Sequence, residues 1–297
     1  MLVNARGGGR PGRACTPERV PVLMYHAVGH APAKAAYGLS VSPGAFAEQM
    51  EQVAQHGCTP MTTEELAHAW RNGGVLPRRP LLITFDDGYE GVHRHALPAL
   101  RKHGFRASLF VTTGWLRGPH EAGGALDTML DWDQVRELEA HGVEIGGHSH
   151  THPQLDQLED EVLAHELRHC RELVAEETGT KPVSFAYPYG YSSRRVRRAV
   201  RESGFGQSLA VNNALAARCQ GPYALTRLTV RRSTDAEEFQ RLLEGRDLGR
   251  TFARDRVLGK GYAVVRRSRR ALTSVWHATG ASAAAGTSAA EGRIARD

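Results

Sequence analysis

A short apolar run ends in two adjacent carboxylates and a glycine at residues 81–89, Leu-Leu-Ile-Thr-Phe-Asp-Asp-Gly-Tyr. A run of this length, bounded by proline and glycine, is typical of a strand buried on both faces of a parallel α/β sheet, where functional groups gather at the carboxyl ends. Because side chains alternate along a strand, Asp86 and Asp87 are expected to point in different directions and to have different roles, such as proton acceptor and metal ligand. The alternative is a turn that caps the next helix, because Asp-Asp-Gly is common in turns.

The rest of the chain alternates predicted strands with predicted helices. Further strands are expected at residues 20–26, 107–111, 143–145, 183–190, 208–211 and 224–230. Amphipathic helices lie between them, and Thr62 with Glu65 predicts a capping box at the start of one. This alternation predicts a single parallel α/β domain over residues 20–245, open or closed as a barrel.

The two ends of the chain lack this pattern. Residues 1–19 form a Gly- and Arg-rich leader that is predicted to be flexible and has no apolar core of an export signal. The periodicity fades after Gly245, so residues 246–297 are predicted to be a flexible tail. No apolar stretch approaches the roughly 20 residues of a membrane span. The sequence therefore predicts no transmembrane segment. These absences favour the cytoplasm, but the sequence gives neither the compartment nor the oligomeric state.

Charge and cysteines exclude some classes of function. The chain has 38 Lys and Arg residues against 32 Asp and Glu residues. Much of the basic charge falls at 194–198 and 266–270, and the first cluster alternates with apolar positions on a predicted helix. This favours a solvated helix face over a site for an acidic partner, and no nucleic-acid partner is expected. The four cysteines are widely spaced, which favours free thiols over a zinc knuckle or a disulfide framework.

A histidine-rich loop follows the predicted strand at 143–145. His148 and His152 are separated by three residues in it, a spacing that allows two imidazoles to bind one ion, and Pro153 favours a tight loop over a helix. With one carboxylate they would make a mixed nitrogen and oxygen site for zinc or another divalent transition metal. His150 is an alternative ligand, and a surface loop without metal is the alternative to any site.

Two of these segments resemble the signature motifs of a known family. Residues 84–88 and 148–152 are similar, in this order and separation, to the first two motifs of the polysaccharide deacetylases, which remove N-acetyl groups from amino-sugar polymers. The resemblance extends over residues 21–243 and implies a distorted (β/α) barrel. It also implies that Asp87, His148 and His152 hold a divalent metal, zinc in the first place with cobalt or nickel as alternatives. Asp86 would then be the general base.

The sequence departs from the family pattern in its later motifs. The third motif usually has an arginine that partners the base, and Ala186 stands in that place. Arg227, on another predicted strand, either supplies the missing charge or is a surface arginine. The family's C-terminal leucine-histidine pair, whose histidine protonates the leaving amine, is also missing, because His277 is the only histidine after His169.

His26 is the candidate for that missing acid. A barrel brings its first strand beside its last, so His26 at the end of the first predicted strand can take the place of the absent histidine. The surrounding sequence also resembles the branch of the family with circularly rearranged motifs, which includes deacetylases of poly-N-acetylglucosamine. The alternative is a core histidine bonded to the backbone.

The resemblance and these residues together predict a metal-dependent hydrolase that releases acetate from an N-acetylated polysaccharide or oligosaccharide. Asp86 is expected to act as the base, His26 as the acid, and the backbone N–H of Tyr189 to face the oxyanion. Two alternatives stay open. One is a deacetylase of a small or lipid-linked amino sugar, and the other is a silent glycan-binding barrel that lost turnover with the arginine.

Overall fold

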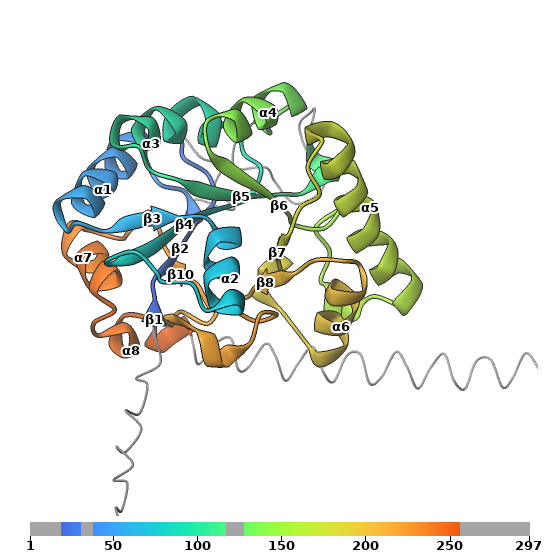
Figure 1. Ribbon diagram of the computed structural model, residues 1–297. Helices are drawn as coiled ribbons and strands as arrows, with labels where there is room; N and C mark the ends of the chain where they lie inside the picture. The colour runs from blue at the N-terminus through green and yellow to red at the C-terminus, as the bar shows by residue number, and fades with distance from the viewer. Residues whose placement is uncertain (1–18, 31–37, 117–127, 256–297) are drawn as a thin grey trace, which may run out of the picture.

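The computed structural model describes residues 19–30, 38–116 and 128–255, which form a curled parallel sheet surrounded by helices (Figure 1). The strands of the main sheet are β2 (Val22–Tyr25), β3 (Thr59–Met61), β4 (Pro80–Asp87), β5 (Ala107–Val111), β6 (Val143–Gly147), β7 (Ser184–Ala186), β8 (Gln207–Leu209) and β10 (Leu228–Thr229). The longer helices are α1 (Pro43–Gln55), α2 (Thr63–Asn72), α3 (Leu97–His103), α4 (Trp132–Ala140), α5 (Asp160–Thr178), α6 (Arg194–Glu202) and α7 (Ala236–Glu244). The shorter elements are β1 (Arg19–Val20), β9 (Ala216–Ala217), the π-helix η2 (Val92–Ala96), the 3-10 turns η3 (Thr113–Trp115), η4 (Leu155–Gln157), η5 (Pro188–Gly190) and η6 (Arg218–Gln220), and α8 (Leu248–Thr251).

The sheet closes on itself through a single segment. Its strands follow the order β10-β2-β4-β5-β6-β7-β8, with β3 paired to the first half of β4. Leu225 bridges to Leu209 of β8, and Leu228 pairs with Leu23 of β2, so one short stretch joins both edges. For this reason the predicted strand at 224–230 is shorter than expected, because it changes neighbours half-way. The predicted (β/α) barrel is confirmed, and its first and last strands lie side by side.

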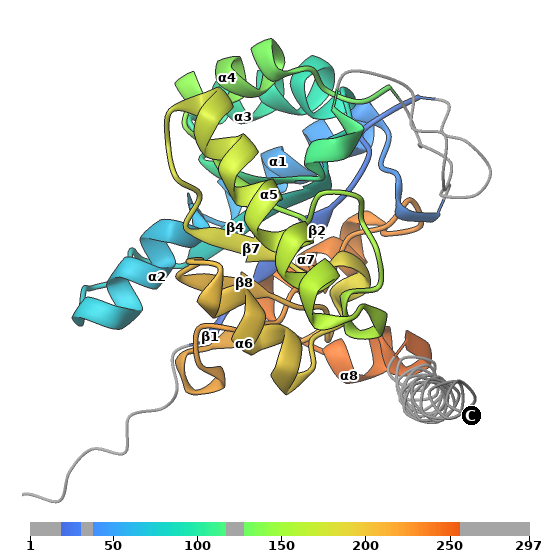
Figure 2. The same ribbon diagram turned by 90° about the vertical axis from the view of Figure 1, so that its right-hand side faces the viewer.

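Helix α2 covers one end of this barrel, from which it projects in Figure 2. The predicted capping box is present, because Thr62 and Glu65 exchange side-chain to backbone hydrogen bonds. The N–H of Thr63 donates to Ser108 Oγ at 3.0 Å, and its hydroxyl donates to Glu144 Oε2 at 2.7 Å. These contacts lie at the amino ends of β5 and β6, so the carboxyl ends of the strands are at the opposite end of the barrel.

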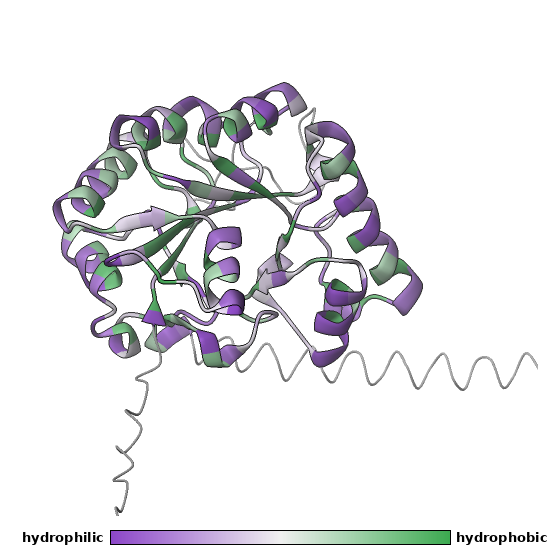
Figure 3. Cartoon of the chain, in the orientation of Figure 1, coloured by the Kyte–Doolittle hydropathy of each residue, from purple (hydrophilic) through white to green (hydrophobic). Residues whose placement is uncertain are grey.

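The side chains of β4 alternate between two apolar layers. Leu81, Ile83 and Phe85 pack in the core between the sheet and the outer helices, whose apolar faces turn inward in Figure 3. Leu82 packs with Phe110 in a separate cluster that fills the barrel interior. By this alternation, the even-numbered residues at the end of β4 face the interior.

The packed chain extends past the predicted boundary at residue 245. Leu248 and Phe252 are buried in the same core as α7, and Asp255 accepts a hydrogen bond from Arg231 at 2.6 Å. The signal for this segment in the sequence is one apolar pair four residues apart, which is too short to show helical periodicity. The rest of the predicted tail, with His277, and residues 1–18 of the predicted leader lie outside the described residues. Among the described helices, none is both long enough and apolar enough to cross a lipid bilayer.

Candidate active site

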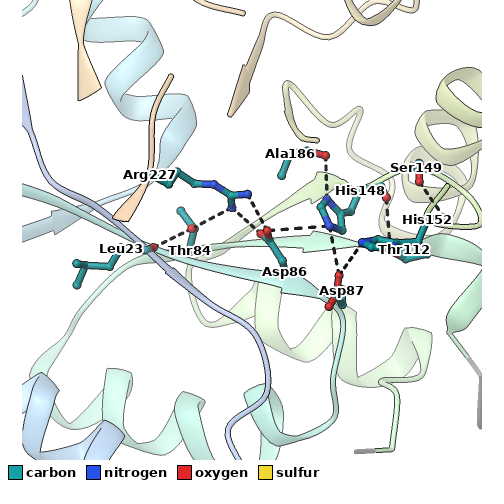
Figure 4. Close-up of polar contacts among 10 residues, drawn as sticks. All are labelled: Leu23, Thr84, Asp86, Asp87, Thr112, His148, Ser149, His152, Ala186 and Arg227. Carbon is teal, nitrogen blue, oxygen red and sulfur yellow. Dashed lines mark hydrogen bonds and ion pairs between the residues drawn. The ribbon is translucent and has the colours of Figure 1, made fainter. Parts of the chain in front are cut away.

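Asp86 and Asp87 end β4 with their side chains in different surroundings (Figure 4). Asp86 continues the inward-facing row of Leu82 and Thr84 and is buried. Asp87 has a φ of 76°, in the left-handed region, and its carboxylate lies against the histidines of the loop after β6. The two acids therefore have different partners, as the alternation of strand side chains predicts.

The partner of Asp86 is Arg227. The guanidinium Nη1 and Nη2 donate to Asp86 Oδ1 and Oδ2 at 2.6 and 2.7 Å, in a two-pronged ion pair. The Arg227 side chain is fully buried, lies over the ring of Phe110 at 5.7 Å, and approaches Thr84 Oγ1 at 3.4 Å. Of the two interpretations of this arginine, a surface position is wrong and a charge beside Asp86 is present.

This ion pair sets the protonation state of Asp86. Burial alone would raise the pKa of Asp86, but the Arg227 guanidinium, and after it His148, hold this pKa below the ordinary value. Asp86 is therefore an ionised carboxylate at neutral pH, which is the form that can accept a proton.

Ala186 contributes its backbone where the family motif has an arginine. Its side chain is buried in the barrel interior beside Phe110 and Leu82. Its carbonyl oxygen lies 2.8 Å from Nδ1 of His148. A carbonyl can only accept, so Nδ1 of His148 carries the hydrogen and Nε2 keeps its lone pair.

Asp87, His148 and His152 form a group that fits a divalent metal. Asp87 Oδ1 lies 3.2 Å from Nε2 of His148 and 3.3 Å from Nε2 of His152, and the ligand atoms of the three residues all lie within 4.8 Å of one another. Asp87 Oδ1 is buried, and it has no hydrogen-bond partner among the described residues unless one of these two Nε2 atoms carries a hydrogen. Two imidazoles and a carboxylate are a ligand set that zinc and similar ions prefer. A cation at this place would satisfy the buried oxygen and the lone pair of His148.

His150 has different neighbours. Its Nδ1 lies 3.0 Å from the hydroxyl of Thr113. The candidate metal-binding group, which is Asp87 with His148 and His152, does not include it. The alternative in which His150 replaces one of these ligands is therefore not favoured by the geometry.

The loop that carries these histidines is held by Glu166 of α5. Ser149 and His152 both have left-handed backbone angles, with φ of 67° and 60°, and such residues cost about 1–3 kcal/mol each unless their surroundings enforce them. The buried carboxylate of Glu166 accepts hydrogen bonds from the N–H groups of His150 and Thr151, both at 2.9 Å, and from the Thr151 hydroxyl at 2.6 Å. The role of Glu166 was not predicted from the sequence. Its signal is a carboxylate on the apolar face of a predicted helix.

His26 and Asp86 lie at the same end of the barrel. β2 pairs with β4 so that Tyr25 is opposite Phe85, and His26 and Asp86 are the next residues on each chain. Nδ1 of His26 is buried and has no hydrogen-bond partner within the described ranges, so this nitrogen is not bonded to the backbone there. Burial lowers the pKa of His26, and the Asp87 and Asp86 carboxylates oppose this shift without cancelling it.

Aromatic rings border the metal-binding group. The Trp115 ring lies 4.8 Å from the ring of His152. The Tyr189 ring lies 4.7 Å from the same His152 ring, in an edge-to-face arrangement. Tyr189 has a φ of 59° and is 52% exposed, and its ring stacks on Tyr191 at 5.8 Å. Tyr189 therefore combines a solvent-exposed ring with a contact to the ring of His152.

Comparison with known proteins gives a match to one family model. Residues 73–207, which include both acids of β4 and both histidines of the metal-binding group, match the model of the polysaccharide deacetylase family. The chain contains a polysaccharide deacetylase domain. The matched region ends before Arg227 and begins after His26, so these two residues of the deacetylase barrel lie outside it.

Relatives and solved structures agree with this family. YxkH of Bacillus subtilis, named as a candidate polysaccharide deacetylase, is 25% identical over 228 residues, which are 77% of each chain. The poly-beta-1,6-N-acetyl-D-glucosamine N-deacetylase of Staphylococcus aureus is 23% identical over 208 residues, covering 67% of this chain and 70% of that one. The Streptococcus pyogenes deacetylase PplD, solved in complex with acetate, matches with a TM-score of 0.68 at 24% identity, over 77% of this chain and 99% of that one. That structural match shows a shared deacetylase fold.

The ion pair between Asp86 and Arg227 predicts a large loss of stability when the arginine is removed. Arg227→Met leaves a buried carboxylate without its partner, so the free energy of unfolding should fall by about 3–5 kcal/mol. Asp86→Asn in the same background should recover part of this loss, because it removes the uncompensated charge. Urea unfolding of the metal-free chains measures both effects.

Arg231→Met is the matched control for this substitution. Arg231 also makes a 2.6 Å ion pair, with Asp255, but both side chains are partly exposed, at 35% and 23%. Solvent screens such a pair, so the control should lose about 1 kcal/mol or less. Equal losses of unfolding free energy in Arg227→Met and Arg231→Met would show that the buried Asp86 pair stabilises the fold no more than an exposed pair.

The contacts of Glu166 predict that it positions the metal ligands. Glu166→Ala removes the acceptor for two loop N–H groups, so the affinity for zinc should fall about 10- to 100-fold, as for other residues that orient metal ligands. Glu166→Gln keeps one acceptor oxygen and should lose less. Competition with a chromophoric chelator measures the affinity. Glu161→Ala, an exposed change on the same helix, should bind zinc like the parent, and parent-like binding by Glu166→Ala would contradict the positioning role.

Proposed function

We propose that this deacetylase domain is an active metal-dependent hydrolase that removes N-acetyl groups from an amino-sugar polymer and releases acetate. The observation that carries the proposal is the two-pronged ion pair of Arg227 with Asp86, directly beside the group of Asp87, His148 and His152. It supports an ionised base next to a metal-binding group, although the family arginine is absent at Ala186.

Asp87, His148 and His152 would hold the metal, with zinc as the first candidate and cobalt or nickel as alternatives. A divalent cation there would supply Lewis acidity toward the acetyl carbonyl and lower the pKa of a water molecule. The hydrogen bond from His148 to the carbonyl of Ala186 keeps Nε2 available as a ligand.

Asp86 is the proposed general base. Its lowered pKa keeps it ionised, and Arg227 holds both of its oxygens in one orientation. It would take a proton from the attacking water as the new carbon–oxygen bond forms. The backbone N–H of Tyr189, at the border of the site, is the proposed donor to the oxyanion.

His26 is the proposed general acid. It lies at the same strand end as Asp86, and its buried Nδ1 has no hydrogen-bond partner in the described part of the chain. When the carbon–nitrogen bond breaks, the departing amine of the sugar needs a proton. His26 would donate it, and the products would be acetate and a free amino sugar.

The polymer substrate is proposed from the relatives. The Staphylococcus aureus relative is named for poly-beta-1,6-N-acetyl-D-glucosamine, and the match covers 67% of this chain. A small or lipid-linked amino sugar is the second candidate substrate. A silent glycan-binding barrel is less well supported. That alternative rested on the absence of the family arginine, and Arg227 forms an ion pair with Asp86, the proposed base.

A substrate panel tests this proposal. Zinc-loaded, untagged protein is incubated with N-acetylglucosamine and with its β-1,6- and β-1,4-linked oligomers, and released acetate is measured. Acetate release that rises with oligomer length is the expected result. Equal rates on the monosaccharide would favour the small substrate, and oligomer binding without acetate would favour the silent barrel.

Asp86→Asn should retain zinc and lose most of its turnover. The substitution keeps the shape of the side chain but removes the proton acceptor, and general-base contributions are typically about 10²- to 10⁴-fold. The measurement is kcat for acetate release, with zinc content determined on the same samples. Asp255→Asn, which alters the partner of Arg231 away from the site, should keep the parent kcat. Loss of zinc from Asp86→Asn would make Asp86 a ligand and not the base.

His26→Ala should impair amide substrates far more than activated esters. An amine leaves poorly without a proton, whereas the phenolate of p-nitrophenyl acetate leaves unaided, so only the amide reaction needs the acid. The alkaline limb of the pH–rate profile on the amide should flatten as well, because the acid form of His26 is lost as pH rises. His30→Ala, an exposed histidine four residues on, is the control. Equal losses on both substrates would assign His26 a structural or binding role.

A further inference from the structure

A second group of histidines lies beside the loop that carries the metal ligands. The ring of His150 is 4.4 Å from that of His169, the rings of His165 and His169 are 5.2 Å apart, and those of His150 and His165 are 6.4 Å apart, centroid to centroid. His165 and His169 belong to α5, the helix turned toward the viewer in Figure 2. The three rings therefore come from two separate parts of the chain and meet at the surface of the domain.

The spacing on α5 is that of a metal-binding helix. Residues 165–169 read His-Glu-Leu-Arg-His, the H-E-x-x-H pattern in which two histidines four residues apart share one helix face. In a tetrahedral zinc site with metal–nitrogen bonds of about 2.0 Å, the centroids of two ligating imidazoles lie about 5 Å apart. The separations between the three rings fall on either side of this value.

The glutamate of the pattern has a different role here. In metalloproteases the residue in its place is the general base. The carboxylate of Glu166 is buried and accepts three hydrogen bonds, from two loop N–H groups and the Thr151 hydroxyl. It faces away from solvent and is already engaged, so this pattern lacks a free base.

We propose that His150, His165 and His169 form a second binding site for a divalent transition metal, separate from the Asp87 group and without hydrolytic function. Three imidazoles suit zinc, nickel or copper, with water at the remaining position. Bound metal would fasten the loop of residues 148–152 to α5 from its outer side. The proposal does not depend on deacetylase activity.

Among the described residues, only Asp87, His148 and His152 bring three ligand atoms within 4.8 Å of one another, so the rings of this second group must turn before they converge on one ion. The rings of His165 and His169 are nearly parallel, at 15°, so one of them must turn before both direct a nitrogen at one ion. His165 is exposed, and no hydrogen bond to a ring nitrogen of His165 or His169 is recorded in the described part of the chain. Rotation about the side-chain bonds of His165 therefore breaks no hydrogen bond within the described ranges and changes only its ring contacts with His150 and His169.

Zinc stoichiometry tests the proposal. Untagged protein is stripped with chelator, incubated with excess zinc chloride, freed of unbound metal by gel filtration, and analysed by atomic emission. The His165→Asn/His169→Asn variant should carry one zinc ion per chain fewer than the parent. His165→Asn alone, on an exposed position, should show the same direction of change. An unchanged zinc content in both variants would overturn the proposal.

Two further variants separate this site from the first one. Asp87→Asn/His148→Asn should also lose one zinc ion, and combining it with His165→Asn/His169→Asn should remove both. His141→Asn, which changes an exposed histidine directly after α4, should leave the content unchanged. If Asp87→Asn/His148→Asn kept the parent zinc content while His165→Asn/His169→Asn lost one ion, the assignment of the Asp87 group would be refuted and the second site would be supported. If the parent hydrolysed casein and the His165→Asn/His169→Asn variant did not, the second site would have a hydrolytic function and this part of the proposal would be wrong.

Discussion

The buried ion pair between Asp86 and Arg227 is the interaction on which the rest of the site depends. The two residues are 141 positions apart, and neither charge can remain in the barrel interior without the other. Arg227 lies in the segment that joins both edges of the sheet, between the bridge at Leu225 and the pairing at Leu228. The segment that closes the barrel therefore also places Arg227 beside Asp86, the proposed base, which couples the stability of the fold to the proposed chemistry.

Backbone strain gathers at the same end of the barrel. Asp87, Ser149, His152 and Tyr189 all have left-handed backbone angles, with φ between 59° and 76°. Residues other than glycine adopt this region only at a cost in conformational free energy. Several such residues at one place are typical of active sites and ligand-binding sites. The means of support are local hydrogen bonds, above all those that Glu166 accepts from the loop after β6. The group of Asp87, His148 and His152 is thus positioned by the barrel and by α5 together.

The parts of this arrangement that follow from local pattern were predictable. The strand that ends in Asp86 and Asp87, the histidine loop and the capping box at Thr62 are each encoded within a few residues. The position of Arg227 was left open, because it depends on how strands distant in sequence close into a barrel. The extension of the core to Phe252 was missed because its apolar pattern is one helical turn long, and Glu166 was missed because its partners are backbone groups of another segment.

The most direct test of this account is the turnover of zinc-loaded Arg227→Lys on an acetylated glucosamine oligomer. Lysine keeps the positive charge but has no planar fork, so it cannot hold both oxygens of Asp86. We expect kcat for acetate release to fall at least about tenfold, because the base loses its orientation, while zinc content stays at the parent level. A parent-like kcat at parent-like zinc content would contradict the claim that the two-pronged pair with Arg227 prepares Asp86 for catalysis.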